Sequence, residues 1–206
     1  TNLYTNSLEF QNASGTSVTT TNAYASSLKI GNRLNQPISS ASNWSVQSQV
    51  TTGAGSRGVE VVGDYAYTIS LSTLRISDIH DPAAPVAIGS LALGVGLNNH
   101  QDIAVYGHYA YVTAHDVPAI YVIDISNPFT PVLVNTITVT APVSIEIQGR
   151  YAYVTDDGAS GGLAVFDLGN ATGPHLMSRV LAGTATRDVA VMGRYAYVTN
   201  GAKVNV

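Results

Sequence analysis

Residues 103–131, IAVYGHYAYVTAHDVPAIYVIDISNPFTP, decide the fold, because versions of this stretch recur along the chain. The tripeptide Tyr-Ala-Tyr within it occurs four times, at Tyr65–Tyr67, Tyr109–Tyr111, Tyr151–Tyr153 and Tyr195–Tyr197. Successive copies start 44, 42 and 44 residues apart. A nearly fixed period of this length is typical of a repeat architecture, so each copy marks one structural unit.

Each Tyr-Ala-Tyr copy follows a hairpin signal. A short alternating apolar run ends at a glycine, and one polar residue separates that glycine from the first tyrosine. The glycines are Gly63, Gly107, Gly149 and Gly193. Glycine tolerates the positive φ that a tight turn needs, so the two runs are predicted to pair as antiparallel strands. Because side chains alternate along a strand, both tyrosines share one face, and the small alanine lies on the other, where another sheet can pack closely.

A third strand in each of the first three units ends in an aspartate, and a proline-marked turn then leads to a fourth strand. These aspartates are Asp78, Asp124 and Asp167. An aspartate at such a position can accept a hydrogen bond from the amide two residues on and so begin the turn. Four short strands in about 43 residues match one blade of a β-propeller. The tyrosines recur in every unit, which favours a role in packing between blades over a role in sugar stacking.

We therefore predict an all-β fold, with a single propeller domain over residues 1–206 and about five four-stranded blades. Full blades are expected at 55–96, 97–138 and 139–182, a partial blade at 183–206, and a degenerate first blade or attachment segment at 1–54. The segment Leu3–Phe10 lies where a fourth strand belongs, and it would complete the last blade and close the ring. The alternative is a fragment of a longer array. The chain begins at Thr1 rather than Met, which indicates a processed chain or a fragment.

The composition excludes several functional classes. Only 11% of the residues are charged and 45% are hydrophobic, a balance opposite to that of disordered chains. The net charge of -4 argues against nucleic acid as a partner. No apolar run approaches the length of about 18 residues that a membrane span needs. Cysteine is absent, which excludes disulfides, thiolate zinc sites and a cysteine nucleophile.

One unit contains histidines and acids that could hold a metal ion. His100 precedes its first strand and His115 follows its second strand, so a hairpin brings both to one rim. Asp102 and Asp116 lie beside them in the sequence, whereas His108 lies in the turn at the opposite end. The spacing matches no known zinc motif, and solvated loop residues are the simpler interpretation.

Two further acidic groups have alternative interpretations. Glu60 and Glu146 occupy equivalent positions in first strands, which line the channel of a propeller. They could act as an acid-base pair, or they could form ion pairs with Arg57 and Arg187. Asp156-Asp157-Gly158 offers oxygen ligands for calcium but lacks the spaced acids of a calcium loop, so an acidic turn is favoured. We predict no cofactor, with calcium as the alternative.

The repeated segments resemble the LVIVD repeat, a β-propeller repeat of extracellular and cell-surface proteins of bacteria and archaea. The resemblance rests on the Tyr-Ala-Tyr cores at Val105–Val112, Ile147–Val154 and Val191–Val198 and on the segment Ile120–Pro131. It covers residues 55–206 well. It implies a propeller and export, often with attachment to a surface, and it carries over no catalytic residue.

No residue set in the sequence stands out as catalytic, so we predict a non-enzymatic structural or adhesive module on a cell surface, filament or virion. Its rim loops would contact a glycan or another copy of the chain, because loops on a rigid scaffold carry most recognition. The last unit has no fourth strand in the sequence, so open edges could also pair between copies. The alternative is a metal-dependent or carboxylate-based hydrolase or lyase that uses the mouth of the propeller channel.

Overall fold

The computed structural model describes residues 46–94, 100–159, 161–181 and 185–206, which all belong to one compact unit, Val46–Val206. Within these ranges every regular element is a β-strand. No helix in the described part of the chain is long and apolar enough to cross a membrane. The all-β prediction is therefore confirmed for these residues.

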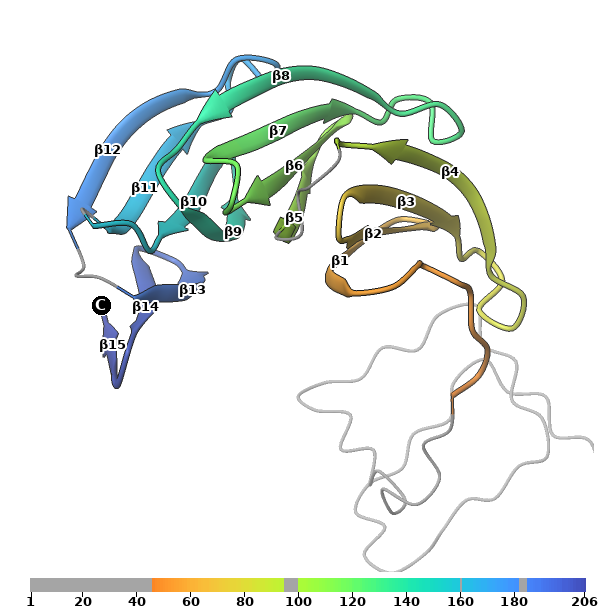
Figure 1. Cartoon of the computed structure of the whole chain (residues 1–206), viewed down its shortest axis with the longest axis horizontal. Coiled ribbons are helices and arrows are strands. Elements are labelled where there is room, and N and C mark those ends of the chain that lie inside the picture. The colour runs from red at the N-terminus through yellow and green to blue at the C-terminus, as the bar shows by residue number, and fades with distance from the viewer. Residues whose placement is uncertain (1–45, 95–99, 160, 182–184) are drawn as a thin grey trace, which may run out of the picture. The chain divides into compact units, whose positions relative to one another are not determined.

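The strands form four antiparallel sheets, one for each repeat, and we name them blades 1 to 4 (Figure 1). Blade 1 contains β1 (Ser56–Val62), β2 (Tyr65–Ser70), β3 (Thr73–Asp78) and β4 (Val86–Ala92). Blade 2 contains β5 (His100–Tyr106), β6 (Tyr109–Ala114), β7 (Ala119–Asp124) and β8 (Val132–Thr138). Blade 3 contains β9 (Pro142–Gln148), β10 (Tyr151–Asp156), β11 (Gly162–Asp167) and β12 (His175–Leu181). Blade 4 contains β13 (Thr186–Met192), β14 (Tyr195–Asn200) and β15 (Lys203–Asn205).

The predicted two-residue turn joins the first two strands of every blade. In blade 1, Val62 pairs with Tyr65 across the turn, and the same register recurs in the other three blades. The glycine at the first turn position has a φ between 58° and 62° in all four blades. This left-handed conformation has no steric cost for glycine, so the glycine signal identified the hairpins correctly.

The aspartate that ends the third strand begins the next turn, as the sequence predicts. Asp78, Asp124 and Asp167 each accept a hydrogen bond from the amide two residues on, at 2.9, 2.8 and 2.8 Å. These backbone hydrogen bonds hold the pKa of each carboxyl below its usual value. The aspartate thus gives the backbone amide two residues on a hydrogen-bond acceptor at the point where the chain leaves the sheet.

Successive blades pack face to face by one rule. The face of a blade that carries its tyrosines (the Tyr face) packs on the face of the next blade that carries its alanine (the Ala face). Tyr67 of blade 1 is buried in one cluster with Ala110 of blade 2, and Tyr111 of blade 2 is buried in another with Ala152 of blade 3. The third junction follows the same rule. The hydrophobic core therefore lies between the sheets, as the small alanine predicts.

The first strand of each blade lies on the inner side, and the fourth strand of blades 1 to 3 lies on the outer side (Figure 1). β1 contacts β5, β5 contacts β9, and β9 contacts β13. Sheets stacked around their first strands form a β-propeller, so the predicted fold is confirmed.

The structure describes four of the about five predicted blades. Residues 46–55, at the end of the predicted degenerate blade, contain no strand. The remainder of that segment, with Leu3–Phe10, lies outside the described residues. Closure of the ring by an N-terminal strand therefore stays a prediction.

Candidate functional site

Three of the four inner strands carry a polar residue at one recurring position, and β1 carries a glycine there. This position holds Gly58 on β1, Asp102 on β5, Ser144 on β9 and Asp188 on β13. The pairing register between the first and second strands shifts beside this position in every blade, which marks a β-bulge. A bulge leaves one residue unpaired and re-aims its side chain, so these residues are available to link neighbouring blades.

A threonine on the second strand satisfies the amide at the bulge in blades 2 to 4. Thr113 Oγ1 accepts a hydrogen bond from the Asp102 amide at 3.0 Å. Thr155 and Thr199 accept the equivalent bond in blades 3 and 4, both at 2.9 Å. Thr113 is fully buried, and its hydroxyl also donates to the Val143 carbonyl of blade 3 at 2.8 Å. The threonine thus holds the bulge and ties blade 2 to blade 3.

The bulge residues also link three inner strands to one another. Asp102 Oδ2 accepts from Ser144 Oγ at 2.8 Å and from the Ile145 amide at 3.0 Å, while Oδ1 accepts from the Ile103 amide at 2.9 Å. The same Ser144 hydroxyl lies 3.1 Å from Asp188 Oδ1. Both oxygens of Asp102 are therefore engaged by the scaffold.

Two glutamates add negative charge to the inner strands. Glu60 on β1 and Glu146 on β9 hold the same position in their blades. Burial raises the pKa of Glu60, and the negative charges of Glu146 and Asp102 raise it further. Burial also raises the pKa of Glu146, with Asp102 and Asp188 adding to the effect. The inner strands therefore favour the protonated form of both glutamates more than water does.

His115 belongs to an ion-pair network on one rim. Its Nε2 lies 2.9 Å from Asp157 Oδ1, and its Nδ1 lies 3.2 Å from Asp116 Oδ1. Arg187, which the sequence suggested as a partner of a channel glutamate, pairs instead with Asp157 at 2.7 Å. Partial burial alone would lower the pKa of His115, but the hydrogen bonds to Asp157 and Asp116 outweigh it and raise the pKa. The network connects loops of blades 2 and 3 with β13 of blade 4.

Two of the four predicted metal ligands are neighbours in the structure. His115 and Asp116 lie together on the rim, whereas Asp102 is engaged by the inner strands. The side chain of His100 lies outside the described residues. Among the described side chains, no three histidines or acids are arranged to hold a metal ion.

Asp156-Asp157-Gly158 forms an acidic turn after β10, the interpretation favoured from the sequence. Asp156 is fully buried and accepts hydrogen bonds from the amides of Ala141 at 3.1 Å and Gly158 at 3.0 Å. Its other oxygen pairs with Arg179. A calcium ion would have to displace these protein donors to reach the carboxylate.

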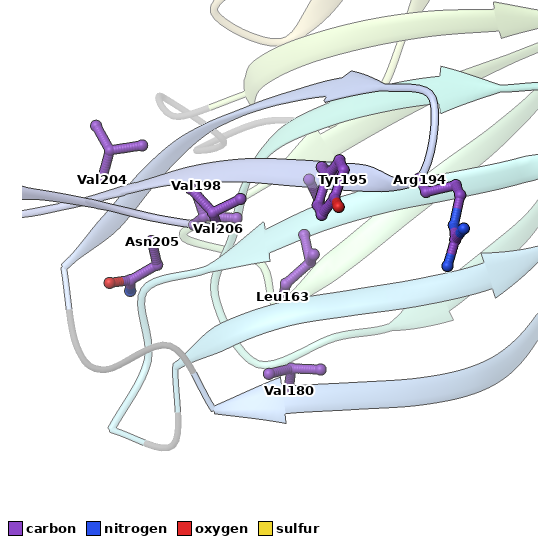
Figure 2. Close-up of a pocket in the computed structure, with 9 residues that line it drawn as sticks. Leu163, Val180, Arg194, Tyr195, Val198, Val204, Asn205 and Val206 are labelled. Atoms are coloured by element: carbon purple, nitrogen blue, oxygen red, sulfur yellow. The ribbon is translucent and has the colours of Figure 1, made fainter.

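A pocket of about 810 Å³ opens between blades 3 and 4 (Figure 2). Leu163 and Val180 of blade 3 line one side, and Tyr195, Val198 and Val204 of blade 4 line the other. At the two earlier junctions, the proline-marked turn of the later blade packs on the outer strand of the earlier one. The described residues of blade 4 form three strands and include no such turn.

The sequence reasoning missed the polar links between inner strands. Ser144 and the three threonines were not singled out, although Tyr-Ala-Tyr-Val-Thr is repeated intact in three of the four units. That recurrence was the available signal. The partner of each threonine lies at the β-bulge of the first strand. The alternation of apolar residues does not reveal where a bulge occurs, so these hydrogen bonds could not be predicted from it.

The sequence profile of the LVIVD repeat matches residues 54–92, 99–139, 143–182 and 183–203. The chain belongs to the LVIVD-repeat family. The resemblance seen in the Tyr-Ala-Tyr cores is therefore confirmed, and the first three matched segments coincide closely with blades 1 to 3. No curated protein matches the chain.

Solved structures of low sequence identity share the fold. A suspected 6-phosphogluconolactonase from Bacteroides uniformis is 16% identical, with a TM-score of 0.60 over 69% of this chain and 46% of its own. Hydrazine synthase of Kuenenia stuttgartiensis is 19% identical, with a TM-score of 0.54 over 69% and 43%. The computationally designed protein Ika4 is 8% identical, with a TM-score of 0.59 over 79% and 96%. The chain thus spans less than half the length of the two natural proteins, and the likeness shows the fold alone.

Proposed function

We propose that this LVIVD-repeat chain is a non-enzymatic structural or adhesive module that acts outside the cell, on a cell surface, filament or virion. It works through protein–protein contacts, self-association included, or through contacts with glycans. Membership of a family of extracellular propellers supports the location. The propeller supplies a rigid support on which edges and rim loops are presented to a partner.

The observation that carries this proposal is the exposure of apolar side chains along the outer strands. Val132, Leu133 and Val134 on β8 are all exposed, and so are Leu176 and Met177 on β12. Both strands are the outermost strands of their sheets. Exposed apolar edge strands are sites at which chains associate, because they combine unpaired backbone groups with apolar surface.

The groups that could do chemistry support the scaffold instead. Asp102 joins β5 to β9, and His115 and Arg187 share the carboxylate of Asp157. A nucleophile or general base has to reach a substrate, and each of these side chains is held by other protein groups. Their arrangement favours a structural role.

The test is the mass of the full chain in solution over a wide range of concentration, measured by size-exclusion chromatography with light scattering, together with binding to an array of immobilised glycans. We expect either a mass that exceeds the 21.5 kDa of one chain and rises with concentration, or retention on a defined glycan class. A chain that stays monomeric at every concentration and binds no glycan contradicts the proposal.

One observation favours a second function, a carboxylate-based hydrolase or lyase at the channel mouth. The raised pKa values of Glu60 and Glu146 bring both carboxyls nearer to the protonated form that a general acid needs. A panel of lactone and glycoside substrates, tried with the wild type and with Glu146→Gln, tests it. Turnover that the substitution abolishes would support this function, and equal rates for the two proteins would remove it.

A further inference from the structure

The turn between β11 and β12 of blade 3 differs in sequence from the two equivalent turns of blades 1 and 2. Blade 3 has Asn170-Ala171-Thr172 at the positions where blade 1 has Asp81-Pro82-Ala83 and blade 2 has Asn127-Pro128-Phe129. An asparagine, any residue except proline, and then a serine or threonine form the acceptor pattern for N-linked glycosylation. Proline breaks this pattern in blades 1 and 2, so the turn of blade 3 is the one of the three that carries it.

The three turns share one backbone hydrogen bond but differ in their side-chain bonds. The fourth turn residue donates its amide to the carbonyl of the first, at 3.0 Å in blade 1 and at 3.1 Å in blades 2 and 3. In blades 1 and 2, the side-chain oxygen of the first residue also accepts from the amide two residues on, at 2.9 and 3.1 Å. In blade 3, Asn170 Oδ1 instead accepts from the Thr172 hydroxyl at 3.1 Å. The amide and the hydroxyl of the acceptor pattern therefore lie side by side.

The first position of this turn faces solvent in all three blades. Asn170 is exposed, and so are Asp81 and Asn127 at the same position of the earlier blades. Blade 2 has a described neighbour on either side, so the exposure belongs to the position and not to a particular blade. No described group hydrogen-bonds to Asn170 Nδ2, the atom that a sugar would join. Gly173 leaves this nitrogen room, because a Cβ there would lie 3.0 Å from it.

Blade 2 holds the turn of blade 3 by its backbone. The Tyr111 hydroxyl donates to the Ala171 carbonyl at 2.8 Å, and Asn135 Nδ2 donates to the Thr172 carbonyl at 2.7 Å. Both bonds use main-chain oxygens, and the side chains of Asn170 and Thr172 stay exposed. A surface loop on a rigid scaffold presents its side chains in a defined arrangement, which suits recognition by an enzyme.

We propose that Asn170 is an acceptor site for N-linked glycosylation, with a lipid-linked oligosaccharide as the donor. Asn170 Nδ2 forms a bond to C1 of the first sugar, and the bond from C1 to the lipid phosphate oxygen breaks. The lipid phosphate leaves with the electron pair, and a base of the transferase takes one proton from the amide. The inference rests on the proposed location outside the cell, because this modification belongs to surface loops of secreted proteins.

The experiment uses the full chain and its variants, purified from the medium and the envelope of the organism that makes it. Trypsin cuts after arginine and releases the peptide Tyr151–Arg179, which contains the acceptor pattern once, at Asn170. We expect tandem mass spectrometry to find a sugar on Asn170 of this peptide. Asn170→Gln and Thr172→Val should abolish the modification, whereas Thr172→Ser should retain it, because the pattern accepts either hydroxyl. Both positions are exposed, so these variants should fold, and circular dichroism confirms this.

The matched control is the equivalent turn of blade 2 in the same protein. The tryptic peptide Ile76–Arg150 contains Asn127 but no acceptor pattern, so it should carry no N-linked sugar. Pro128→Ala combined with Phe129→Thr gives this turn the pattern of blade 3, and Asn127 should then be modified.

The outcomes separate this inference from the proposed function. A chain found outside the cell with an unmodified Tyr151–Arg179 peptide overturns the inference and leaves the proposed location standing. A sugar on this peptide that persists in Asn170→Gln also overturns it, because the attachment is then at another residue. A chain found only inside the cell contradicts the proposed location, on which the inference rests.

Discussion

The junction between blades 1 and 2 and the junction between blades 2 and 3 join the same faces of the same repeat by different means. The second junction is crossed by hydrogen bonds. Thr113 bonds the Val143 carbonyl, and the Tyr111 hydroxyl donates to the Ala171 carbonyl at 2.8 Å. Asp102 accepts further bonds from the Ser144 hydroxyl and the Ile145 amide, and Asn135 Nδ2 donates to the Thr172 carbonyl.

The first junction has residues without hydrogen-bonding side chains where the second has hydrogen-bonding ones. Gly58 stands in the position of Asp102, and its Cα lies so close to β5 that an added Cβ would be 3.1 Å from the Asp102 Cα. Gly89 stands in the position of Asn135, and the Pro128 carbonyl oxygen occupies the space that a Cβ would need. Ile69 replaces Thr113 and is fully buried.

This comparison shows that the repeated Tyr-Ala-Tyr pattern determines which faces of neighbouring blades pack together. The residues at a few further positions determine whether close packing or hydrogen bonds stabilise the contact. At the first junction the backbones approach closely, and the contact depends on shape. At the second junction the side chains reach across and satisfy backbone groups. The two junctions should therefore respond to different substitutions.

The largest effect should come from Gly89→Ala at the first junction. The added methyl group meets a backbone carbonyl, which cannot move aside as a flexible side chain can, so we expect a loss of about 3 kcal/mol in the free energy of unfolding. Urea titration followed by circular dichroism measures it. Ser178→Ala, at the equivalent and exposed position of blade 3, should change stability by less than about 0.5 kcal/mol. Equal losses for the two variants would show that the close approach at Gly89 is unimportant.

The next effect should come from Asp102→Ala at the second junction. Its removal leaves the Ile145 amide and the Ser144 hydroxyl without this acceptor, so we expect a loss of about 2 kcal/mol. Asp188→Ala should cost less, because the firm donor to Asp188 is the adjacent Val189 amide. The Ser144 hydroxyl has one proton and lies closer to Asp102, at 2.8 Å, than to Asp188, at 3.1 Å. An Asp102 variant as stable as the wild type would mean that packing alone holds this junction.

A smaller effect should separate two equivalent tyrosines. Tyr111→Phe removes the hydrogen bond to the Ala171 carbonyl and should cost about 1 kcal/mol. Tyr67→Phe should cost almost nothing, because the Tyr67 hydroxyl makes no such bond to the described residues of blade 2. Chemical denaturation of both variants measures the difference. A loss at Tyr67 as large as at Tyr111 would contradict the distinction between the junctions.

The features predicted correctly from the sequence are those that depend on a few neighbouring residues. The turn at Gly63 needs only a positive φ, and the turn after Asp78 needs only an amide two residues on. The links between blades could not be predicted in the same way, because Asp102 and Ser144 are 42 residues apart. The repeat aligns such residues, but only the distance between neighbouring sheets decides whether they touch. The same limit applies to His115, whose partner Asp157 is also 42 residues away.

The smallest effect should be a pH dependence of the free energy of unfolding. It arises from His115, whose ion-pair network joins blades 2, 3 and 4. Hydrogen bonds to Asp157 and Asp116 raise its pKa in the folded chain, although partial burial opposes them. A raised pKa in the folded state means that the stabilisation is fully present below the unfolded pKa of about 6.5. It is then lost as the pH rises through the folded value.

His115→Gln should therefore be less stable than the wild type by about 0.5 kcal/mol at a pH below that range, and the difference should shrink as the pH rises. Urea titrations at a series of pH values measure the difference. Asp157→Asn removes the partner on Nε2, so a further His115→Gln change in that background should show a weaker pH dependence. A difference between wild type and His115→Gln that stays constant with pH would show that His115 acts through packing, because only its charged form gains from the carboxylates.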